Sequence, residues 1–238
     1  YVKTKNGVDA KLYHSYKGKE KKVTTPKSFG YINISSLNSK SNDLWMVSEG
    51  WTSKKERYYL DFDNFQFKKE NLSPVVQYKH LEDVVIEEIE IKSYDGVMVP
   101  LSIVYKKGLK KDGNNRVLLN GYGAYKWSNS PYLYSYLNHW VKEGGVYATA
   151  HIRGGGEKGE NWHKGGYKTT KPNTWKDFIA CTEYLINKKY TSPDKTKSIS
   201  IIPSESSNKA IPSSKGRFEP LFLSIIFPSS ILSIMTLF

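Results

Sequence analysis

An alternation of apolar strands and amphipathic helices over residues 84–202 most constrains the fold of this chain. Residues 84–94 and 98–105 alternate apolar and polar side chains on either side of Asp95-Gly96, a pattern that predicts an antiparallel hairpin. Further strands are predicted at residues 116–120, 146–152 and 198–202, and helices at 132–141 and 174–189. This order predicts an α/β fold, with a mostly parallel sheet that is covered on both faces.

The helix predicted at residues 174–189 has the clearest boundary signals. Asn173 is a suitable N-cap, and Thr174-x-x-Asp177 resembles a capping box. One face of this helix is expected to be buried, with Trp175, Phe178, Ile179, Leu185 and Ile186.

Residues 1–75 have a different pattern, in which short strands containing aromatic residues are separated by polar turns. Turns are predicted at Asn6-Gly7 and at residues 17–19. Strands are expected at residues 1–2, 11–16, 29–34, 44–49 and 57–62. Such strands are typical of the blades of a β-propeller or of the edge of a sandwich.

The composition excludes several classes of function. The formal net charge is +13, but the basic residues are mostly scattered lysines, and arginine occurs only at Arg57, Arg116, Arg153 and Arg217. Proteins that read bases favour arginine, so nucleic-acid binding is not expected. The one cysteine, Cys181, excludes an intrachain disulfide and a cysteine-based metal cluster. A cytoplasmic location is therefore favoured, with the periplasm as the alternative.

Two of the predicted strands end in glycines, at Gly121-Tyr122-Gly123 and at Gly154-Gly155-Gly156. Ligands of α/β sheets bind at the carboxyl ends of the strands, and glycine lets a backbone approach a ligand closely. Neither of the common nucleotide-binding glycine motifs is present. The sequence therefore predicts a ligand site at this edge of the sheet, with no cofactor and no metal.

Four stretches of the sequence resemble one known family. They are KSYDGVMVPLSIVYKKG (92–108), NGYGAY (120–125), AHIRGGGEKGENWHKGG (150–166) and NTWKDFIACTEYLI…YTSP (173–193). Together they resemble the prolyl oligopeptidase family of serine peptidases. The resemblance implies a seven-bladed propeller joined to an α/β-hydrolase domain, and cleavage of short proline-containing peptides after proline.

The same resemblance divides the chain into three regions. Residues 1–79 correspond to the last blades of the propeller, and residues 80–200 correspond to the first part of the catalytic domain. Residues 201–238 do not match the family and are expected to be an aberrant tail. The first residue is Tyr1 and no signal peptide follows it, so the start is expected to be a processing point or a cut end.

The resemblance also implies roles for individual side chains. Tyr122 matches the tyrosine that donates its hydroxyl to the oxyanion hole, and Tyr125 matches an aromatic residue that contacts the substrate. His151 and His163 precede the position of the nucleophile, whereas the catalytic histidine of an α/β-hydrolase follows it, so both are expected to be packed or hydrogen-bonded instead. An ion pair is expected between Arg153 and Glu157.

The sequence departs from the family where the nucleophile is expected. The family places its serine in a glycine-flanked turn after the strand that follows residues 190–193, but this chain has no glycine between Gly166 and Gly216. Pro203 is expected to end the strand early. The serines of this stretch, which lack flanking glycines, are Ser204, Ser206 and Ser207. The nucleophile, the acid and the base are therefore predicted to be absent and the chain inactive, and a frameshift or truncation is the hypothesis for their loss.

Two other functions are weighed against an inactive peptidase. One is a peptide-binding fragment that uses the surface of Tyr122 and Tyr125, or an open sheet edge that adds a strand from a partner. The other is a tail-anchored membrane protein, because residues 221–238 are uncharged and about long enough to cross a bilayer. Pro228 and several serines in that stretch argue against the anchor.

Overall fold

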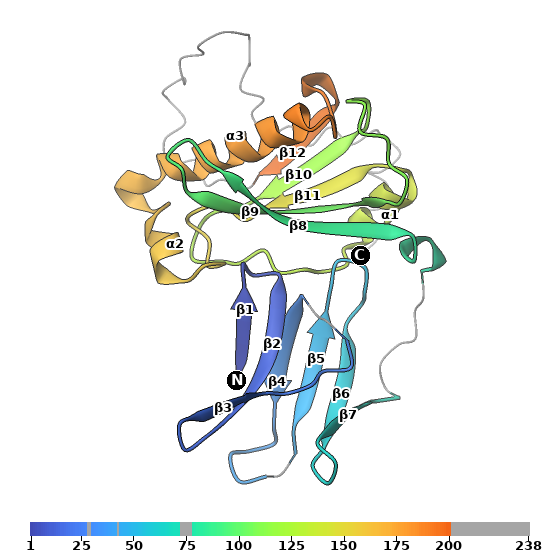
Figure 1. Ribbon diagram of the computed structural model, residues 1–238, viewed down its shortest axis with the longest axis vertical. Helices are drawn as coiled ribbons and strands as arrows, with labels where there is room; N and C mark the ends of the chain where they lie inside the picture. The colour runs from blue at the N-terminus through green and yellow to red at the C-terminus, as the bar shows by residue number, and fades with distance from the viewer. Residues whose placement is uncertain (28–29, 42, 72–77, 201–238) are drawn as a thin grey trace, which may run out of the picture.

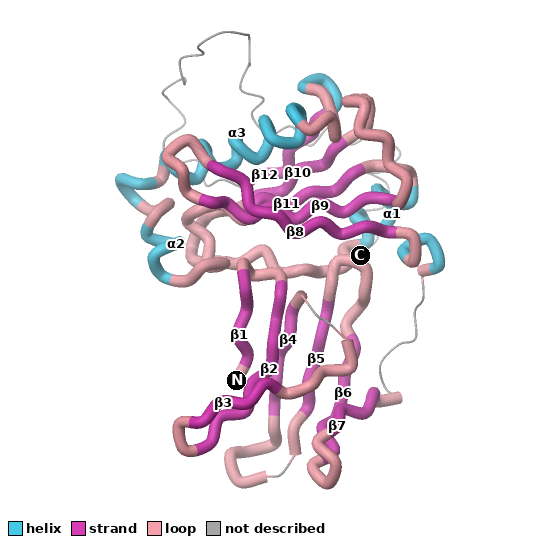
Figure 2. Tube along the Cα trace, viewed as in Figure 1, coloured by secondary structure: helices cyan, strands magenta, loops and turns pink. Residues whose placement is uncertain are grey.

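The computed structural model describes residues 1–27, 30–41, 43–71 and 78–200 (Figure 1). Residues 1–71 form an N-terminal unit of strands, and residues 78–200 form an α/β unit. In the described residues the helices all belong to the α/β unit, as Figure 2 shows. Predictions for residues 201–238, including the membrane anchor and the late serines, lie outside the described residues. No helix in the described part of the chain has the length and apolar character needed to cross a bilayer.

The N-terminal unit consists of two small antiparallel sheets. The first has the order β1-β2-β3 and the second the order β4-β5-β6-β7. The strands are β1 (Val2–Lys5), β2 (Asp9–Tyr16), β3 (Lys19–Lys22), β4 (Tyr31–Ser35), β5 (Trp45–Glu49), β6 (Glu56–Asp61) and β7 (Gln66–Lys69). Both predicted turns are confirmed, because Asn6, Gly7, Lys17 and Gly18 all have positive φ between paired strands.

Glu56 of β6 joins this strand to β7 and to the segment between β3 and β4. Its carboxylate lies 2.7 Å from Lys27 Nζ and 2.9 Å from Lys69 Nζ, and it accepts a hydrogen bond of 2.8 Å from the Tyr58 hydroxyl. Burial acts to raise the pKa of Glu56, but the hydrogen bonds from Lys27, Lys69 and Tyr58 outweigh it and lower the pKa to about 2. A carboxylate whose folded pKa is lowered stabilises the protein above its unfolded pKa of about 4.3, and this contribution is lost as the pH falls through the folded pKa.

We therefore expect Glu56→Gln to lower the melting temperature at pH 7 and to flatten its fall between about pH 4.3 and about pH 2. Thermal unfolding followed by circular dichroism at several pH values measures both effects. Asp63→Asn is the matched control, because Asp63 is exposed and among the described residues its carboxylate forms no ion pair. An acid profile that is the same in the Glu56 and Asp63 variants would contradict the prediction.

The sheet of the α/β unit contains both parallel and antiparallel pairs, in the order β12-β10-β11-β9-β8. Its strands are β8 (Val84–Lys92), β9 (Met98–Lys106), β10 (Val117–Gly121), β11 (Val146–Ala150) and β12 (Thr196–Ser200). The predicted hairpin is confirmed as β8 and β9, with Gly96 at a φ of 85° in the turn. β10 pairs in parallel with β11 on one side and with β12 on the other. The carboxyl end of β10 is thus central to the parallel part of the sheet.

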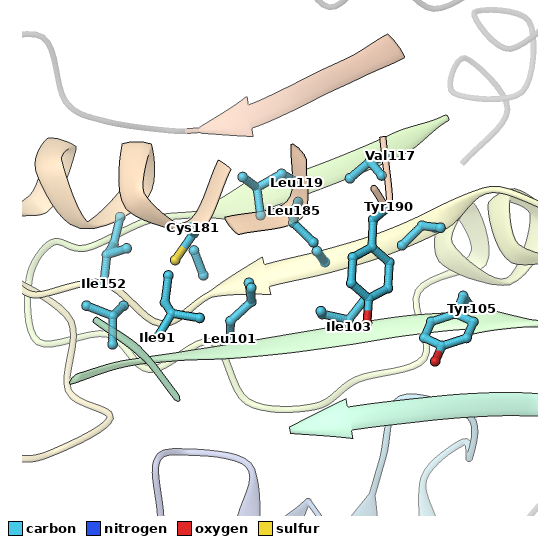
Figure 3. Packing of buried hydrophobic residues seen from close by; sticks show 14 of the residues in the cluster. Ile91, Leu101, Ile103, Tyr105, Val117, Leu119, Ile152, Cys181, Leu185 and Tyr190 are labelled. Carbon is cyan, nitrogen blue, oxygen red and sulfur yellow. The ribbon is translucent and has the colours of Figure 1, made fainter. Parts of the chain in front are cut away.

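Apolar residues cover both faces of this sheet. Adjacent residues of β10 point to opposite faces, and Leu119 packs in the cluster beneath α3 (Pro172–Asn187) whereas Leu118 packs in the cluster beneath α1 (Ser135–Lys142). Cys181 and Leu185 of α3 point into the first cluster, as Figure 3 shows. The remaining helical segments are η1 (Lys79–Leu81), α2 (Glu160–Lys164), η2 (Lys168–Thr170) and η3 (Pro193–Lys195).

The start of α3 differs from the prediction. The helix begins at Pro172, and its N-cap is Lys171, whose side chain makes no capping hydrogen bond. The predicted cap Asn173 lies inside the first turn and donates a hydrogen bond of 2.8 Å to the carbonyl of Gly165. The predicted capping box is wrong because its polar residues bind neighbouring loops instead of the helix terminus.

The buried face of α3 also differs from the prediction. The residues that are fully buried are Thr174, Asp177, Cys181 and Leu185. Ile179, which was expected to be buried, is 42% exposed. Two polar residues occupy the buried face because each has a hydrogen-bond partner there, so a pattern of apolar residues alone does not find it.

Trp51, just after β5, connects the N-terminal unit to the α/β unit. Its side chain is 4% exposed and packs in the cluster of α1, next to Tyr147 of β11 at a ring separation of 6.0 Å. Its indole Nε1 donates a hydrogen bond of 2.9 Å to Glu88 of β8. The N-terminal strands therefore lie on the face of the sheet that is opposite to α3 (Figure 1).

Candidate functional site

Two glycine loops meet at the carboxyl ends of β10 and β11. Gly123 follows β10 with a φ of +58°, and Gly154 follows β11 with a φ of +100°. A Cβ atom on Gly154 would lie 2.0 Å from the carbonyl oxygen of Gly123, so the two backbones are in direct contact. Lys126 N also donates to the Gly154 carbonyl at 3.2 Å. The glycines were expected to let the backbone approach a ligand, but these two let one loop approach the other.

Helix α3 holds both loops in place. Lys171 Nζ donates a hydrogen bond of 2.6 Å to the carbonyl of Gly123, and burial lowers the pKa of this amine. Thr174 Oγ1 donates to the carbonyl of Arg153 at 2.8 Å, and the backbone N–H of Arg153 donates to Asp177 Oδ2 at 3.1 Å. The side chains of α3 and its N-cap therefore tie the backbones of both loops to the same helix.

The structure brings Tyr122 and Tyr125 together on this edge. Their ring centroids are 6.4 Å apart. Tyr122 directly follows β10 and is half-buried, and among the described residues its hydroxyl has no hydrogen-bond partner. Tyr125 is 76% exposed and has a φ of 51°, which is unusual for a residue with a Cβ atom. A free phenol and an exposed flat ring thus face solvent side by side.

Trp127 is a third aromatic residue of this loop, and the sequence patterns did not single it out. It is 67% exposed, and its carbonyl accepts a hydrogen bond of 3.2 Å from the backbone N–H of Gly156. No periodicity marks an exposed loop residue. The only signal was its position two residues after Tyr125, within a loop that was already a candidate.

The predicted ion pair between Arg153 and Glu157 is wrong. Arg153 binds Asp177 of α3 at 2.6 Å and Asp95 of the β8–β9 turn at 2.6 Å. Glu157 lies instead 3.6 Å from His151 Nδ1, and it accepts a hydrogen bond of 2.9 Å from the backbone N–H of Asn129. The two side chains thus bind different parts of the unit, Arg153 the β8–β9 turn and α3, and Glu157 the segment after Trp127.

The two histidines are packed and hydrogen-bonded, as predicted. His151 is fully buried, and its Nε2 lies 2.8 Å from Ser102 Oγ. His163 Nδ1 lies 2.8 Å from the carbonyl of Gly154, and its ring stacks on Tyr167 at 5.1 Å. Neither histidine is next to Tyr122 or Tyr125 in these contacts.

Comparison with known proteins gives one consistent family. Residues 131–198 match the model of the prolyl oligopeptidase family. The chain is 46% identical over 114 residues to a prolyl endopeptidase of Elizabethkingia meningoseptica, which covers 48% of this chain and 16% of the relative. It is 47% identical over 114 residues to an uncharacterized peptidase of Rickettsia prowazekii (strain Madrid E), with the same shares of 48% and 16%.

A solved structure gives the same result for the fold. Prolyl oligopeptidase B of Galerina marginata, bound to a 25mer macrocyclization substrate, superposes with a TM-score of 0.75 at 27% identity. The match covers 84% of this chain and 30% of the solved one. The chain thus spans less than a third of the length of the proteins it matches, and its fold is a partial α/β-hydrolase sheet preceded by propeller strands. The family model, the sequence relatives and the solved structures thus all indicate the same family, the prolyl oligopeptidase family of serine peptidases.

Proposed function

We propose that residues 120–127 form the oxyanion and substrate-contacting side of a site that hydrolyses proline-containing peptides. In this proposal the Tyr122 hydroxyl donates a hydrogen bond to the oxygen that becomes negative in the tetrahedral intermediate. A single such donor contributes about 10²–10³ in rate. The observation that carries the proposal is the free hydroxyl of Tyr122 at the end of the central parallel strand, beside the exposed ring of Tyr125.

Tyr125 is proposed to contact the substrate through its ring. A flat aromatic surface packs well against the pyrrolidine ring of proline, because both are rigid and apolar. The hydrogen bonds of Lys126 and Trp127 to the glycine loop hold the ring out to solvent before any peptide binds, so little conformational entropy is lost on binding.

The division of the chain into regions is proposed to be that of the prolyl oligopeptidase family. Residues 1–79 are assigned to propeller blades, and residues 80–200 to the first part of the catalytic domain. β12 lies next to β10 in parallel, so a nucleophile that followed β12 would emerge near Tyr122. In this sequence the residues after β12 lack the glycines of a nucleophile turn, and we propose that this chain alone does not hydrolyse peptides.

A fluorogenic substrate with a Gly-Pro bond tests the proposed inactivity. We expect no turnover above the rate of a buffer blank, because removing the nucleophile of a serine protease costs about 10⁶ in kcat. Turnover that copurifies with the chain, and that a serine-directed inhibitor abolishes, would contradict the proposal.

Peptide binding tests the proposed roles separately from hydrolysis. A peptide containing Gly-Pro is titrated into the ¹⁵N-labelled chain, with a Gly-Ala peptide for comparison. We expect the Gly-Pro peptide to shift the signals of residues 120–127, and Tyr125→Ala to weaken its binding about tenfold, which is about 1.4 kcal/mol. Tyr16→Ala is the control, because Tyr16 is 64% exposed and lies on β2 in the N-terminal unit. Equal binding by both variants would rule out a contact with Tyr125.

A further inference from the structure

Gly123 lies between the two tyrosines of the proposed site, and it has more backbone freedom than its neighbours. A Cβ atom there would lie 2.5 Å from Thr174 Cγ2 and 2.7 Å from Ile152 Cγ1, so the packing of the loop excludes any larger residue. Glycine adopts positive and negative φ about as readily, and here φ is +58°. The backbone that carries Tyr122 and Tyr125 therefore needs a contact from outside the loop to keep one conformation.

The carbonyl of Gly123 makes such a contact. Gly123 is buried, and a buried carbonyl without a hydrogen-bond partner is unfavourable. Its partner is the ammonium group of Lys171, which donates at 2.6 Å. Among the described residues no other donor binds this oxygen. One lysine thus supplies the polar contact of the peptide group between the two tyrosines.

Lys171 is an unfavourable residue for its own helix. It is the N-cap of α3, a position that favours side chains able to accept a hydrogen bond from the first N–H groups, and lysine has no acceptor. A positive charge at the N-terminus of a helix is also repelled by the helix dipole. The first turn, residues 172–175, contains no acidic residue that would offset this charge. The stability of α3 therefore does not explain a lysine at this position.

Lys171 also lacks a partner of opposite charge. Among the described residues its ammonium group forms no ion pair, and the buried acid of the same helix, Asp177, is bound by Arg153. Burial lowers the pKa of the Lys171 amine, so the surroundings disfavour its charge. Conflicts between a residue and its local structure are expected at functional positions, where a contact made elsewhere outweighs them. The contact that Lys171 makes elsewhere is the one with Gly123.

We propose that Lys171 is a positioning residue, which keeps the peptide group between Gly123 and Ala124 in the orientation that presents Tyr122 and Tyr125 together. Without its hydrogen bond this peptide group is free to rotate, and the two tyrosines lie on opposite sides of the rotation. Lys171 itself touches neither the substrate nor the reacting oxygen in this role. The role rests on the proposed function, because it prepares the loop for a peptide.

NMR can observe this one peptide group by itself. Gly123-Ala124 is the only place in the chain where alanine follows glycine. In the full chain labelled with ¹³C at the glycine carbonyls and with ¹⁵N at alanine, a carbonyl-to-amide experiment therefore gives a single signal. We expect Lys171→Met to move the ¹³C shift of this signal upfield, because the hydrogen bond of the carbonyl is lost, and to broaden or split the signal as the peptide group samples a second orientation. An unchanged signal would overturn the proposal.

Lys106→Met is the matched control for the loss of a lysine. Lys106 is also half-buried, and its Nζ donates to a backbone carbonyl, that of Lys142 at 3.0 Å, at the end of α1. We expect this variant to leave the signal of Gly123-Ala124 in place. Lys171→Arg keeps a cationic donor, so its signal is expected to lie closer to that of the unchanged chain than the signal of Lys171→Met does. Equal shifts in the Lys106 and Lys171 variants would refute a specific contact.

Peptide binding and thermal unfolding separate positioning from a merely structural role. We expect Lys171→Met to bind the Gly-Pro peptide about two- to tenfold more weakly, because only the fraction of molecules with the correct loop orientation is competent to bind. Its melting temperature is expected to change by less than about 4 °C, because the loss of one hydrogen bond is offset by the removal of an unpaired charge from a helix N-terminus. A merely structural role would instead lower the melting temperature further and leave the affinity of the folded chain unchanged.

The same titration distinguishes failure of this role from failure of the proposed function. If the unchanged chain binds the Gly-Pro peptide and Lys171→Met binds it equally well, the positioning role is refuted and the site itself stands. If the unchanged chain does not bind the peptide, the proposed function fails and the positioning role fails with it. Weaker binding by Lys171→Met, together with a shifted Gly123-Ala124 signal and normal binding by Lys106→Met, is the result that supports the proposal.

Discussion

Replacing Gly154 with alanine is expected to lower the free energy of unfolding by more than about 4 kcal/mol. Losses of this size are exceptional for single substitutions and have a specific structural cause. The new Cβ would lie 2.0 Å from the Gly123 carbonyl oxygen and 2.8 Å from the Gly166 carbonyl oxygen. Both contacts are with backbone, so no side-chain rotation relieves them. A φ of +100° adds strain for any residue with a side chain. Urea unfolding followed by tryptophan fluorescence measures the loss.

Gly108→Ala separates the two causes of this loss. Gly108 has a φ of +85°, but a Cβ atom there would meet no atom within 4 Å. Its substitution is expected to cost only the backbone term, about 1–2 kcal/mol. Losses of similar size at both positions would show that the contact between the two glycine loops contributes little.

Replacing Asp177 with alanine is expected to cost about 3–5 kcal/mol, because it removes one partner of a buried ion pair. Asp177 is fully buried and accepts hydrogen bonds from Ser93 Oγ and from the backbone N–H, Nε and Nη2 of Arg153. Without it, a guanidinium that is 7% exposed keeps a single carboxylate partner. The free energy of unfolding in urea measures the cost, and the amide signals of residues 153–156 are expected to shift with it.

Asp95→Ala is the control on the same guanidinium. The Asp95 side chain is 29% exposed, and the hydrogen bond from Arg153 lowers the pKa of this carboxyl despite some burial. Pairs that are this accessible to water contribute about 1 kcal/mol or less. If Asp95→Ala lowered the free energy of unfolding as much as Asp177→Ala, the buried carboxylate would not be the more stabilising partner of Arg153.

The sequence allowed the order of the elements to be predicted, because each one depends on local pattern. The β8–β9 hairpin follows from alternation around Asp95-Gly96, and β10 and β11 follow from short apolar runs that end in glycine. β3 and β7 were not predicted, since Lys19–Lys22 is exposed throughout and Gln66–Lys69 mostly so, which leaves no apolar alternation to detect.

Contacts between side chains that are distant in the sequence were harder to predict from local patterns. Arg153 and Glu157 were expected to form an ion pair, but the partner of Arg153 comes from α3 and that of Glu157 from the loop after Tyr125. The buried polar face of α3 was missed for the same reason, because Thr174 and Asp177 are buried by loops that pattern does not place. The pair of Tyr122 and Tyr125 was found through motif resemblance, and its catalytic role stays a prediction.

The position of Trp51 has a consequence for the order in which the chain folds during synthesis. The ribosome makes Trp51 before β9, α1 and β11, which supply Val104, Leu137 and Tyr147 around its indole. Domains that are made first can fold first, but here the N-terminal strands leave the ribosome with an indole that has nothing to cover it. Those strands cannot complete their burial until Tyr147 has been translated, so the two units reach their final packing together.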